Sequence, residues 1–513
     1  MDNNQSNNKR IAKNTIALYI RMLFSMVVGF YTSRVILNVL GISDYGIYNV
    51  VGSVVSMFSF LSGSMSLSTS RFLTFELGKN NYQRFEELFK SSITIHCAIA
   101  LIVFIITEVI GLWFLYNKMT MPDDRLFAAQ YVFQLSLISS IFSIVFIPFT
   151  SAIIAYEKMT AFAWMSIFDV TAKLVIVFVL QVFPYDKLIV YAYLIFFVTI
   201  LNQLILVIYS KRKLKGTVLG LRFVKTDFMH LFSFAGWTMF GQITYVGFTQ
   251  GLNMLLNMFF SPAVNAARGI AVQVQTLIYK FVGNVQTAFN PQITKNYAAN
   301  QIEEMHTLVF ACSKFSFFLL LIISAPVIIE TPYLLELWLK IVPEYTVSFF
   351  RIIILVSFVD ALANPLIISN MATGKVKSWN IVCGTILILI VPVSYICLRM
   401  GLPAISVFYV HFICAIITQI TRLFFLRNSI QLSIRQYFKK VIQPTMCVFV
   451  VSLACGFGIH NVFPEQSIIY LLLVCFLTFV SCCFSIMFIG LNSAERILVY
   501  SKSRQLIQRF VQK

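Results

Sequence analysis

A stripe of polar side chains runs along the apolar stretch at 263–290. Its members recur at steps of three, seven, four, seven and four residues: Asn265, Arg268, Gln275, Tyr279, Gln286 and Asn290. At about 100° per residue they fall within a helical arc of about 80°. Unpaired polar groups are costly in lipid, so such a face lines either a wet cavity or a tight helix interface. We favour the cavity, in which the stripe would contact a polar ligand.

Cations inside apolar stretches indicate the charge of that ligand. Arg34 lies in the first stretch and Lys173 in the fifth, while Lys280 shares the stretch of Arg268. A charged side chain is expensive inside a membrane, which makes each of these a candidate functional residue. Guanidinium and ammonium groups around one cavity would attract an anion, and a phosphate group matches arginine well.

The acids inside apolar stretches allow two interpretations. Asp169 precedes Lys173 by four residues, so we expect these two side chains to form an ion pair that removes Lys173 from the ligand site. Glu108 and Asp360 lack such a local partner. Any of the three acids Asp169, Glu108 and Asp360 that is not paired with a cation could bind a coupling proton or sodium ion. The alternative is a salt bridge to a neighbouring helix.

These side chains belong to a chain that is too apolar for a soluble protein. Of its 513 residues, 59% are hydrophobic and 12% are charged, and the mean hydropathy is +0.83. Soluble proteins contain about 45–50% apolar and about 25% charged residues. We therefore predict an integral membrane protein. This composition excludes a disordered chain, a secreted disulfide scaffold and a nucleic-acid-binding module.

Fourteen apolar stretches have the length of a membrane-spanning helix. They fall at 14–40, 46–72, 88–116, 126–155, 159–183, 187–210, 228–260, 263–290, 305–332, 346–373, 376–399, 402–427, 441–462 and 467–491. Backbone groups cannot stay unpaired in lipid, so each stretch must be helical. The predicted fold class is an all-α membrane protein of about 14 transmembrane helices.

Basic residues in the connecting segments predict the orientation. With the N-terminus inside, 25 Lys and Arg fall in inside segments and five in outside loops. Short cytoplasmic loops carry such an excess, so both ends are predicted to be cytoplasmic. The segment 492–513 is basic and amphipathic, which favours a tail on the anionic inner leaflet. A frayed tail is the alternative.

The two longest basic loops divide the chain into parts. They predict an N-lobe of six helices at 1–215, a C-lobe of six helices at 216–430 and an extra helix pair at 431–491. Polar helices about 220 residues apart in the two lobes suggest a repeat. Because each lobe has an even number of helices, the predicted pseudo-two-fold axis runs along the membrane normal, with a substrate cavity between the lobes.

Enzyme and cofactor signatures are absent from the sequence. It contains no P-loop, no large outer loop that could hold a catalytic domain, and no His, Cys or carboxylate cluster with metal-ligand spacing. The ten cysteines lie in apolar stretches and are interpreted as small hydrophobic residues. We predict a protein that is not an enzyme, with no metal and no cofactor.

Three segments resemble a known family. SRVILNVLGISDYGIYNVV, FNPQITKNYAAN and LLELWLKIVPEY are similar to the Wzx-type polysaccharide-biosynthesis flippases of the MATE-like multidrug/oligosaccharidyl-lipid/polysaccharide (MOP) superfamily. The turn LG-x-x-DYG-x-Y comprises Leu40, Gly41, Asp44, Tyr45, Gly46 and Tyr48. Leu337, Trp338 and Pro343 carry the third match. In lipid II flippases, essential arginines stand at the positions of Met26 and Thr32, so that role is not carried over.

The resemblance implies a flippase of the inner (cytoplasmic) membrane. Its cargo would be an undecaprenyl-pyrophosphate-linked oligosaccharide, such as an O-antigen or capsule repeat unit, carried to the outer leaflet by alternating access. Arg268 and Arg34, then Lys280, would contact the pyrophosphate. Gln275, Tyr279 and Gln286 would face the sugar. Membrane lipids and polysaccharide polymerase or assembly proteins are the partners that it implies.

Two other functions stay open at this point. The first is cation-coupled efflux of a drug or metabolite through Glu108 and Asp360, as in MATE exporters. The basic interior and the two extra helices count against it. The second is a scaffold in a polysaccharide assembly complex without transport of its own. Drug sensitivity of a deletion strain would separate efflux from flipping, and silent lumen substitutions would indicate a scaffold.

Overall fold

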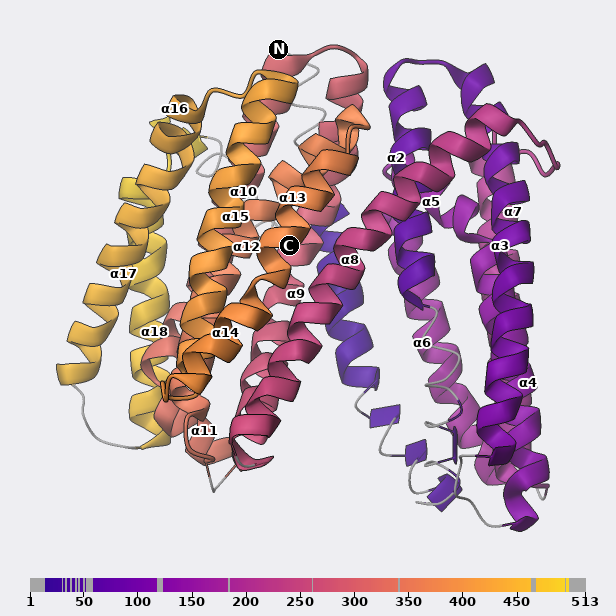
Figure 1. Ribbon diagram of the computed structural model, residues 1–513, viewed down its shortest axis with the longest axis horizontal. Helices are drawn as coiled ribbons and strands as arrows, with labels where there is room; N and C mark the ends of the chain where they lie inside the picture. Colours follow the sequence, from indigo (N-terminus) through magenta and orange to yellow (C-terminus); the bar gives the residue numbers. More distant parts are fainter. Residues whose placement is uncertain are drawn as a thin grey trace, which may run out of the picture. The chain divides into compact units, whose positions relative to one another are not determined.

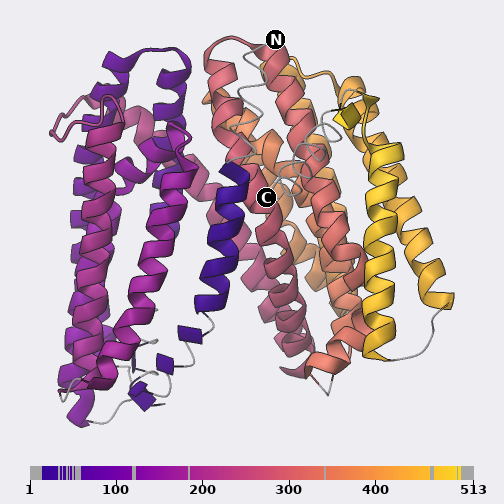
Figure 2. The same cartoon turned by 180° about the vertical axis from the view of Figure 1, so that it is seen from behind.

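The computed structural model describes residues 14–29, 31–32, 35–36, 39–41, 44, 47–48, 51, 59–117, 123–182, 185–260, 262–339, 342–462, 467–493 and 495–497. Within these ranges the chain is almost entirely helical and contains no β-strand. Figures 1 and 2 show long helices that run alongside one another within each half of the chain. The predicted all-α class is confirmed.

Most helices match the predicted stretches, although α2 and α9 end later than predicted and parts of the stretches at 14–40 and 46–72 lie outside the described residues. The first half of the described chain contains a helix at Asn14–Gly29, then α2 (Ser59–Gly78), α3 (Tyr82–Asn117), α4 (Leu126–Val145), α5 (Ile147–Ala155), α6 (Met159–Val182) and α7 (Lys187–Lys213). The second contains α8 (Lys225–Phe259), α9 (Pro262–Ala298), α10 (Ile302–Ile329), α11 (Thr331–Leu339), α12 (Thr346–Thr373), α13 (Lys377–Ile388), α14 (Ile390–Arg399), α15 (Ser406–Ile430), α16 (Ile434–Tyr437), α17 (Gln443–Val462) and α18 (Ile468–Ser485).

Two predicted stretches are each divided between two helices. The stretch at 126–155 breaks at Phe146, between α4 and α5, and Pro148 lies in the first turn of α5. Proline lacks a backbone N–H and fits that first turn, where the N–H has no helical partner. The stretch at 376–399 breaks at Leu389, between α13 and α14, shortly before Pro392. Both pairs still cover the length of one span.

The helices have the length and surface of a multi-pass membrane protein. Among the described residues, ten helical segments are long and apolar enough to cross a membrane. Large apolar side chains such as Val182, Ile469 and Phe488 are exposed on them. Such extensive exposure is unfavourable in water and is expected in lipid. Three other long helices, α2, α8 and α9, are not among the ten because they carry more polar residues.

Two compact units divide the chain. Unit 1 comprises Met1–Gln242 and Ala288–Gln301, and unit 2 comprises Ile243–Thr287 and Ile302–Lys513. Helix α8 begins in unit 1 and ends in unit 2, whereas α9 begins in unit 2 and ends in unit 1. The predicted lobes at 1–215 and 216–430 rest on the basic loops and not on packing, so they stay a prediction.

Each unit has its own core. In unit 1, Phe85, Phe89 and Phe149 pack together with edge-to-face and stacked rings where α3 meets α5. In unit 2, α10 and α12 are the most buried of the candidate spans. Helix α12 is surrounded by apolar contacts yet carries Asp360 near its middle. That placement gives a membrane acid a fixed position beside α9 and α15.

Candidate polar site of unit 2

Arg268 of α9 is held by the facing part of α8. One terminal nitrogen of its guanidinium donates to the side-chain oxygen of Asn253, and the other donates to the backbone carbonyl of Thr249 over 3.1 Å. Thr249 and Asn253 are four residues apart, so they lie on one face of α8. Only 8% of Arg268 is exposed. The sequence predicted Arg268 as a site residue, but it did not predict the partners of Arg268 on α8.

The charge of Arg268 is not neutralised by a carboxylate. Both acceptors are neutral oxygens, and among the described residues Arg268 forms no ion pair. Its Nε atom has no hydrogen-bond partner there either. His411 of α15 lies within electrostatic range of the guanidinium. A buried cation with neutral partners leaves an uncompensated positive charge that an anion could satisfy.

Two amides of the predicted stripe bind α12. Gln275 donates to the Ser357 hydroxyl over 2.8 Å, and Gln286 donates to the Ala361 carbonyl over 3.0 Å. Gln286 is almost completely buried. At these two positions the stripe forms the interhelical hydrogen bonds that were the alternative to cavity lining. Contact of Gln275 and Gln286 with a sugar stays a prediction.

Asp360 lies within a small polar cluster. Tyr245, Tyr279 and Arg422 are all within electrostatic range of its carboxylate, and the Tyr279 hydroxyl is hydrogen-bonded to Gln286. Arg422 of α15 is buried and donates to the Gln419 side chain over 3.3 Å. Asp360 thus has a cation nearby on another helix, but the salt bridge that the sequence allowed as an alternative is not present among the described residues. The cluster and Arg268 together contain two guanidinium groups and one carboxylate.

The remaining predicted site residues lie elsewhere. Lys280 is exposed on α9 and makes no ion pair with any residue that the structure describes. Arg34 is outside the described residues, and the side chain of Asn265 is not described. In unit 1, the Lys173 ammonium is 2.7 Å from the Asp169 carboxylate, so the predicted ion pair is present.

Glu108 of α3 has a neutral partner. The side-chain amide of Gln134 on α4 donates to one carboxylate oxygen over 2.7 Å. The second oxygen is buried and has no hydrogen-bond partner within the described part of the chain. No salt bridge to Glu108 is present there, so the expected alternative of a neighbouring cation is not met. A vacant carboxylate oxygen could accept a proton or contact a cation.

Comparison with known proteins shows the fold. No protein-family model matches the sequence, and neither does any curated protein. Among solved structures, the outward-facing form of a multidrug resistance MATE family transporter of the MOP superfamily matches with a TM-score of 0.71 and 12% identity. The match covers 83% of this chain and 96% of that one. The chain has the MATE transporter fold.

Other solved structures give the same result. A MOP superfamily transporter from Pyrococcus furiosus, described as having a binding pocket of reverse polarity, matches with a TM-score of 0.68 and 12% identity. A MATE protein in its straight conformation matches with a TM-score of 0.70 and 12% identity. Each match covers 83% of this chain and 96% of the other. The MATE fold agrees with the superfamily to which the sequence resemblance points.

Within the MATE fold, the motif residue Asp44 has a structural partner that the sequence did not reveal. Arg125, next to the start of α4, donates to both carboxylate oxygens of Asp44, one of them over 2.9 Å, and to Asp186 over 2.5 Å. Asp186 also accepts from the backbone N–H groups of Leu188 and Ile189 and so caps α7. Burial lowers the pKa of Arg125, but its bonds to Asp44 and Asp186 outweigh this and raise it.

We expect Asp44→Asn to destabilise unit 1. The substitution leaves Arg125 with one acidic partner instead of two, and Asp44 is buried. The free energy of unfolding should fall by about 1–3 kcal/mol, less than for a fully buried pair because Arg125 is partly exposed. Thermal unfolding in detergent measures the loss. Asp124→Asn, a neighbouring exposed acid, is the matched control, and an equal loss in both variants would contradict this role.

Proposed function

We propose that the chain is a membrane transporter that moves a lipid-linked oligosaccharide with a pyrophosphate group from the inner to the outer leaflet. One observation carries the proposal: Arg268 is buried in a helix of the MATE fold and has only neutral partners. An uncompensated guanidinium attracts anions and binds a phosphate through two parallel hydrogen bonds. The sequence segments that resemble Wzx-type flippases support the lipid-linked sugar as the cargo.

The charge balance of unit 2 supports an anionic cargo. A transporter of cationic drugs needs acids that face its cavity, whereas Arg268 and Arg422 outnumber Asp360 in this region. The Pyrococcus furiosus neighbour is described as having reversed pocket polarity and a different function. That description supports the idea that the charge of the pocket differs among proteins of this fold according to what they carry.

Alternating access supplies the mechanism of the proposal. Solved MATE neighbours are recorded in straight and bent conformations. In this chain α8 contains four glycines. At Gly236 and Gly247 there is open space: an added Cβ atom would meet no other atom within 4 Å. Glycine weakens a helix by about 1 kcal/mol per residue. We propose that α8 bends at these positions while the cargo crosses.

Deletion and complementation separate flipping from drug efflux. A deletion strain should lose surface polysaccharide and keep wild-type drug resistance. Asp360→Asn tests the efflux alternative, because removing this carboxylate would abolish cation-coupled efflux. We expect Asp360→Asn to restore polysaccharide export to within about tenfold of wild type. The variant keeps Arg422 beside position 360, so the positive charge that an anionic cargo needs is retained. Drug hypersensitivity of the deletion strain, together with full polysaccharide, would contradict the proposed function.

A further inference from the structure

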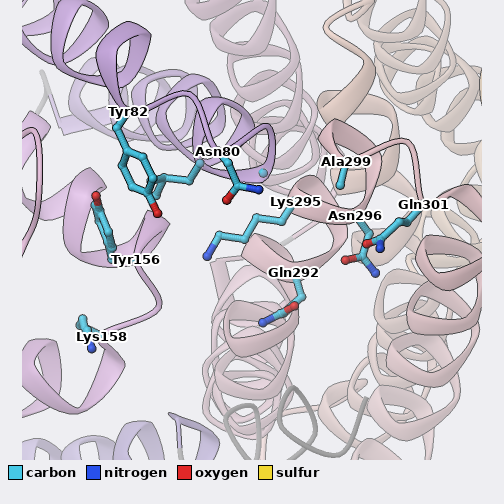
Figure 3. A pocket seen from close by; sticks show the side chains of 11 residues that line it. Asn80, Tyr82, Tyr156, Lys158, Gln292, Lys295, Asn296, Ala299 and Gln301 are labelled. Atoms are coloured by element: carbon cyan, nitrogen blue, oxygen red, sulfur yellow. The ribbon is translucent and has the colours of Figure 1, made fainter. Parts of the chain in front are cut away.

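A polar cavity lies in unit 1, at the end that the basic loops predict to be cytoplasmic. Its volume is about 500 Å³, within the range of about 300–1,000 Å³ typical of small-molecule sites. The lining comes from the end of α2, the start of α3, the turn between α5 and α6, and the last turns of α9. Figure 3 shows the side chains of Tyr82 and Lys295 extending into the same space from α3 and α9.

The α9 side of the cavity is built from one of the segments that the sequence singled out. FNPQITKNYAAN supplies Gln292, Lys295, Asn296 and Ala299 to the lining. This segment is pressed against the end of α2: a Cβ at Gly78 would lie 2.7 Å from the Cβ of Ala298 and 2.8 Å from the Lys295 carbonyl. Contacts this close keep the cavity walls in place. The motif therefore shapes a cavity outside the polar site of unit 2.

Two cations and no acid line the cavity. Lys295 is compensated, since its ammonium lies 2.6 Å from the carboxylate of Glu157, a buried residue that is not part of the lining. Lys158 has no acidic partner in the part of the chain that the structure describes. The lining thus carries an excess of positive charge. A ligand with negative charge would gain mainly from the ammonium group of Lys158, because that of Lys295 is already paired with Glu157.

Neutral donors complete the site. Asn296 is only 8% exposed, lines the cavity, and its side-chain amide has no hydrogen-bond partner among the described residues. The amide atoms are not among the fully buried atoms without a partner, so they keep surface at the cavity and can bond to a ligand there. The Tyr82 hydroxyl is also available. Tyr156 lines the cavity but adds no free donor, because its hydroxyl donates to the Lys215 carbonyl over 2.7 Å, and burial raises its pKa to about 12.

We propose that this cavity binds the phosphate group of a polar ligand. The uncompensated ammonium of Lys158, the paired ammonium of Lys295, the Asn296 amide and the Tyr82 hydroxyl all present N–H or O–H donors, and a phosphate offers several acceptor oxygens to such a set. The site is separate from Arg268 and does not depend on the identity of the transported cargo. The phosphate could belong to a soluble ligand or to a lipid head group.

Titration with inorganic pyrophosphate tests the site. The purified full-length chain in nanodiscs of zwitterionic lipid should bind pyrophosphate in a calorimetric titration. Lys158→Gln should weaken binding by about 10-fold or more, the effect of one lost charge-assisted hydrogen bond. Asn296→Ala should weaken it by about 3-fold or more without changing the net charge. Lys213→Gln, the same charge change on an exposed residue of α7, should leave the dissociation constant unchanged.

A second set of nanodiscs distinguishes the source of the phosphate. Adding phosphatidic acid should lower the apparent pyrophosphate affinity if lipid head groups occupy the cavity, and should leave it unchanged if the ligand is soluble. Both results agree with a phosphate site, provided that the Lys158→Gln effect is present. No pyrophosphate binding to the folded wild type, or equal binding to wild type and Lys158→Gln, would overturn the proposal. Thermal unfolding of every variant confirms that it is folded.

Discussion

Replacing Arg268 with glutamine is expected to remove most transport while leaving the protein at least as stable as the wild type. These two effects have opposite signs because Arg268 is a buried cation without a carboxylate. Removing a buried uncompensated charge lowers a desolvation cost. Glutamine keeps an N–H donor that can reach toward Asn253, so the contact between α8 and α9 is retained in part. A residue important only for folding would show the reverse pattern.

The size of the transport defect follows from the lost bonds. A hydrogen bond to a charged group contributes about 1.5–3 kcal/mol, so the transport rate at low cargo concentration should fall about 10–100-fold. Arg268→Lys should fall in between, because an ammonium keeps the charge but cannot form two parallel bonds with a phosphate. Surface polysaccharide in cells and the thermal midpoint of the purified variant give the two measurements.

Arg351→Gln is the matched control for this prediction. Arg351 is another arginine of a membrane-spanning helix, and it donates to the Ile328 carbonyl over 3.2 Å. The control removes the same charge from unit 2 at a position outside the polar site. Transport by Arg351→Gln should stay within about twofold of wild type. Equal losses in the two variants would indicate a general effect of net charge and would contradict a specific role for Arg268.

The second large effect is expected at Glu157, whose side chain is fully buried in unit 1. Its carboxylate accepts from Lys295 over 2.6 Å and from the Gln292 amide over 2.5 Å, while its backbone carbonyl accepts from Asn14 over 3.0 Å. Removing one partner of a fully buried ion pair costs about 3–5 kcal/mol, but Lys295 is 20% exposed at the cavity, so the cost here should be about 2–3 kcal/mol. Glu157→Ala should therefore lower the free energy of unfolding by about that amount.

Backbone strain at Glu157 does not confound this comparison. The residue has a φ of 58°, in the left-handed region. Alanine has a Cβ as glutamate does, so the strain is the same in both proteins. Glu86→Ala is a suitable control, since Glu86 pairs with Lys90 at the surface and should contribute less than about 1 kcal/mol.

A double-mutant cycle isolates the pair. Glu157→Gln and Lys295→Met should each destabilise the protein, and the double variant should be less destabilised than the sum of the two. The expected coupling energy is at least about 1 kcal/mol, measured by denaturant or thermal unfolding. Additive effects would show that Glu157 and Lys295 do not depend on each other, in conflict with the structure.

The sequence predicted the helices well because length and hydropathy alone determine which stretches can cross a membrane. It could not predict pairing between distant residues. The Asp44–Arg125 contact joins positions 81 residues apart, and a single sequence contains no signal for it. The i, i+4 pair of Asp169 and Lys173 was predictable since both partners lie on one helix.

The candidate site was predicted in part for the same reason. Helical periodicity places Arg268, Gln275 and Gln286 on one face of α9, but it does not say what that face meets. The structure shows α8 at Arg268 and α12 at the two glutamines. The polar face therefore includes helix contacts as well as a cation without a counter-charge. Asn253 and Thr249 would have been found only by knowing that α8 packs there.

Translocation in proteoliposomes tests the central claim most directly. Purified protein is reconstituted with a fluorescent undecaprenyl-pyrophosphate oligosaccharide, and quenching from outside reports the leaflet of the label. We predict rapid flipping by wild type and Arg351→Gln, and a loss of about 10-fold or more for Arg268→Gln. Equal flipping by wild type and Arg268→Gln would contradict a cationic cargo site at Arg268. Efflux of a cationic drug by the same vesicles, without flipping, would contradict the proposed cargo.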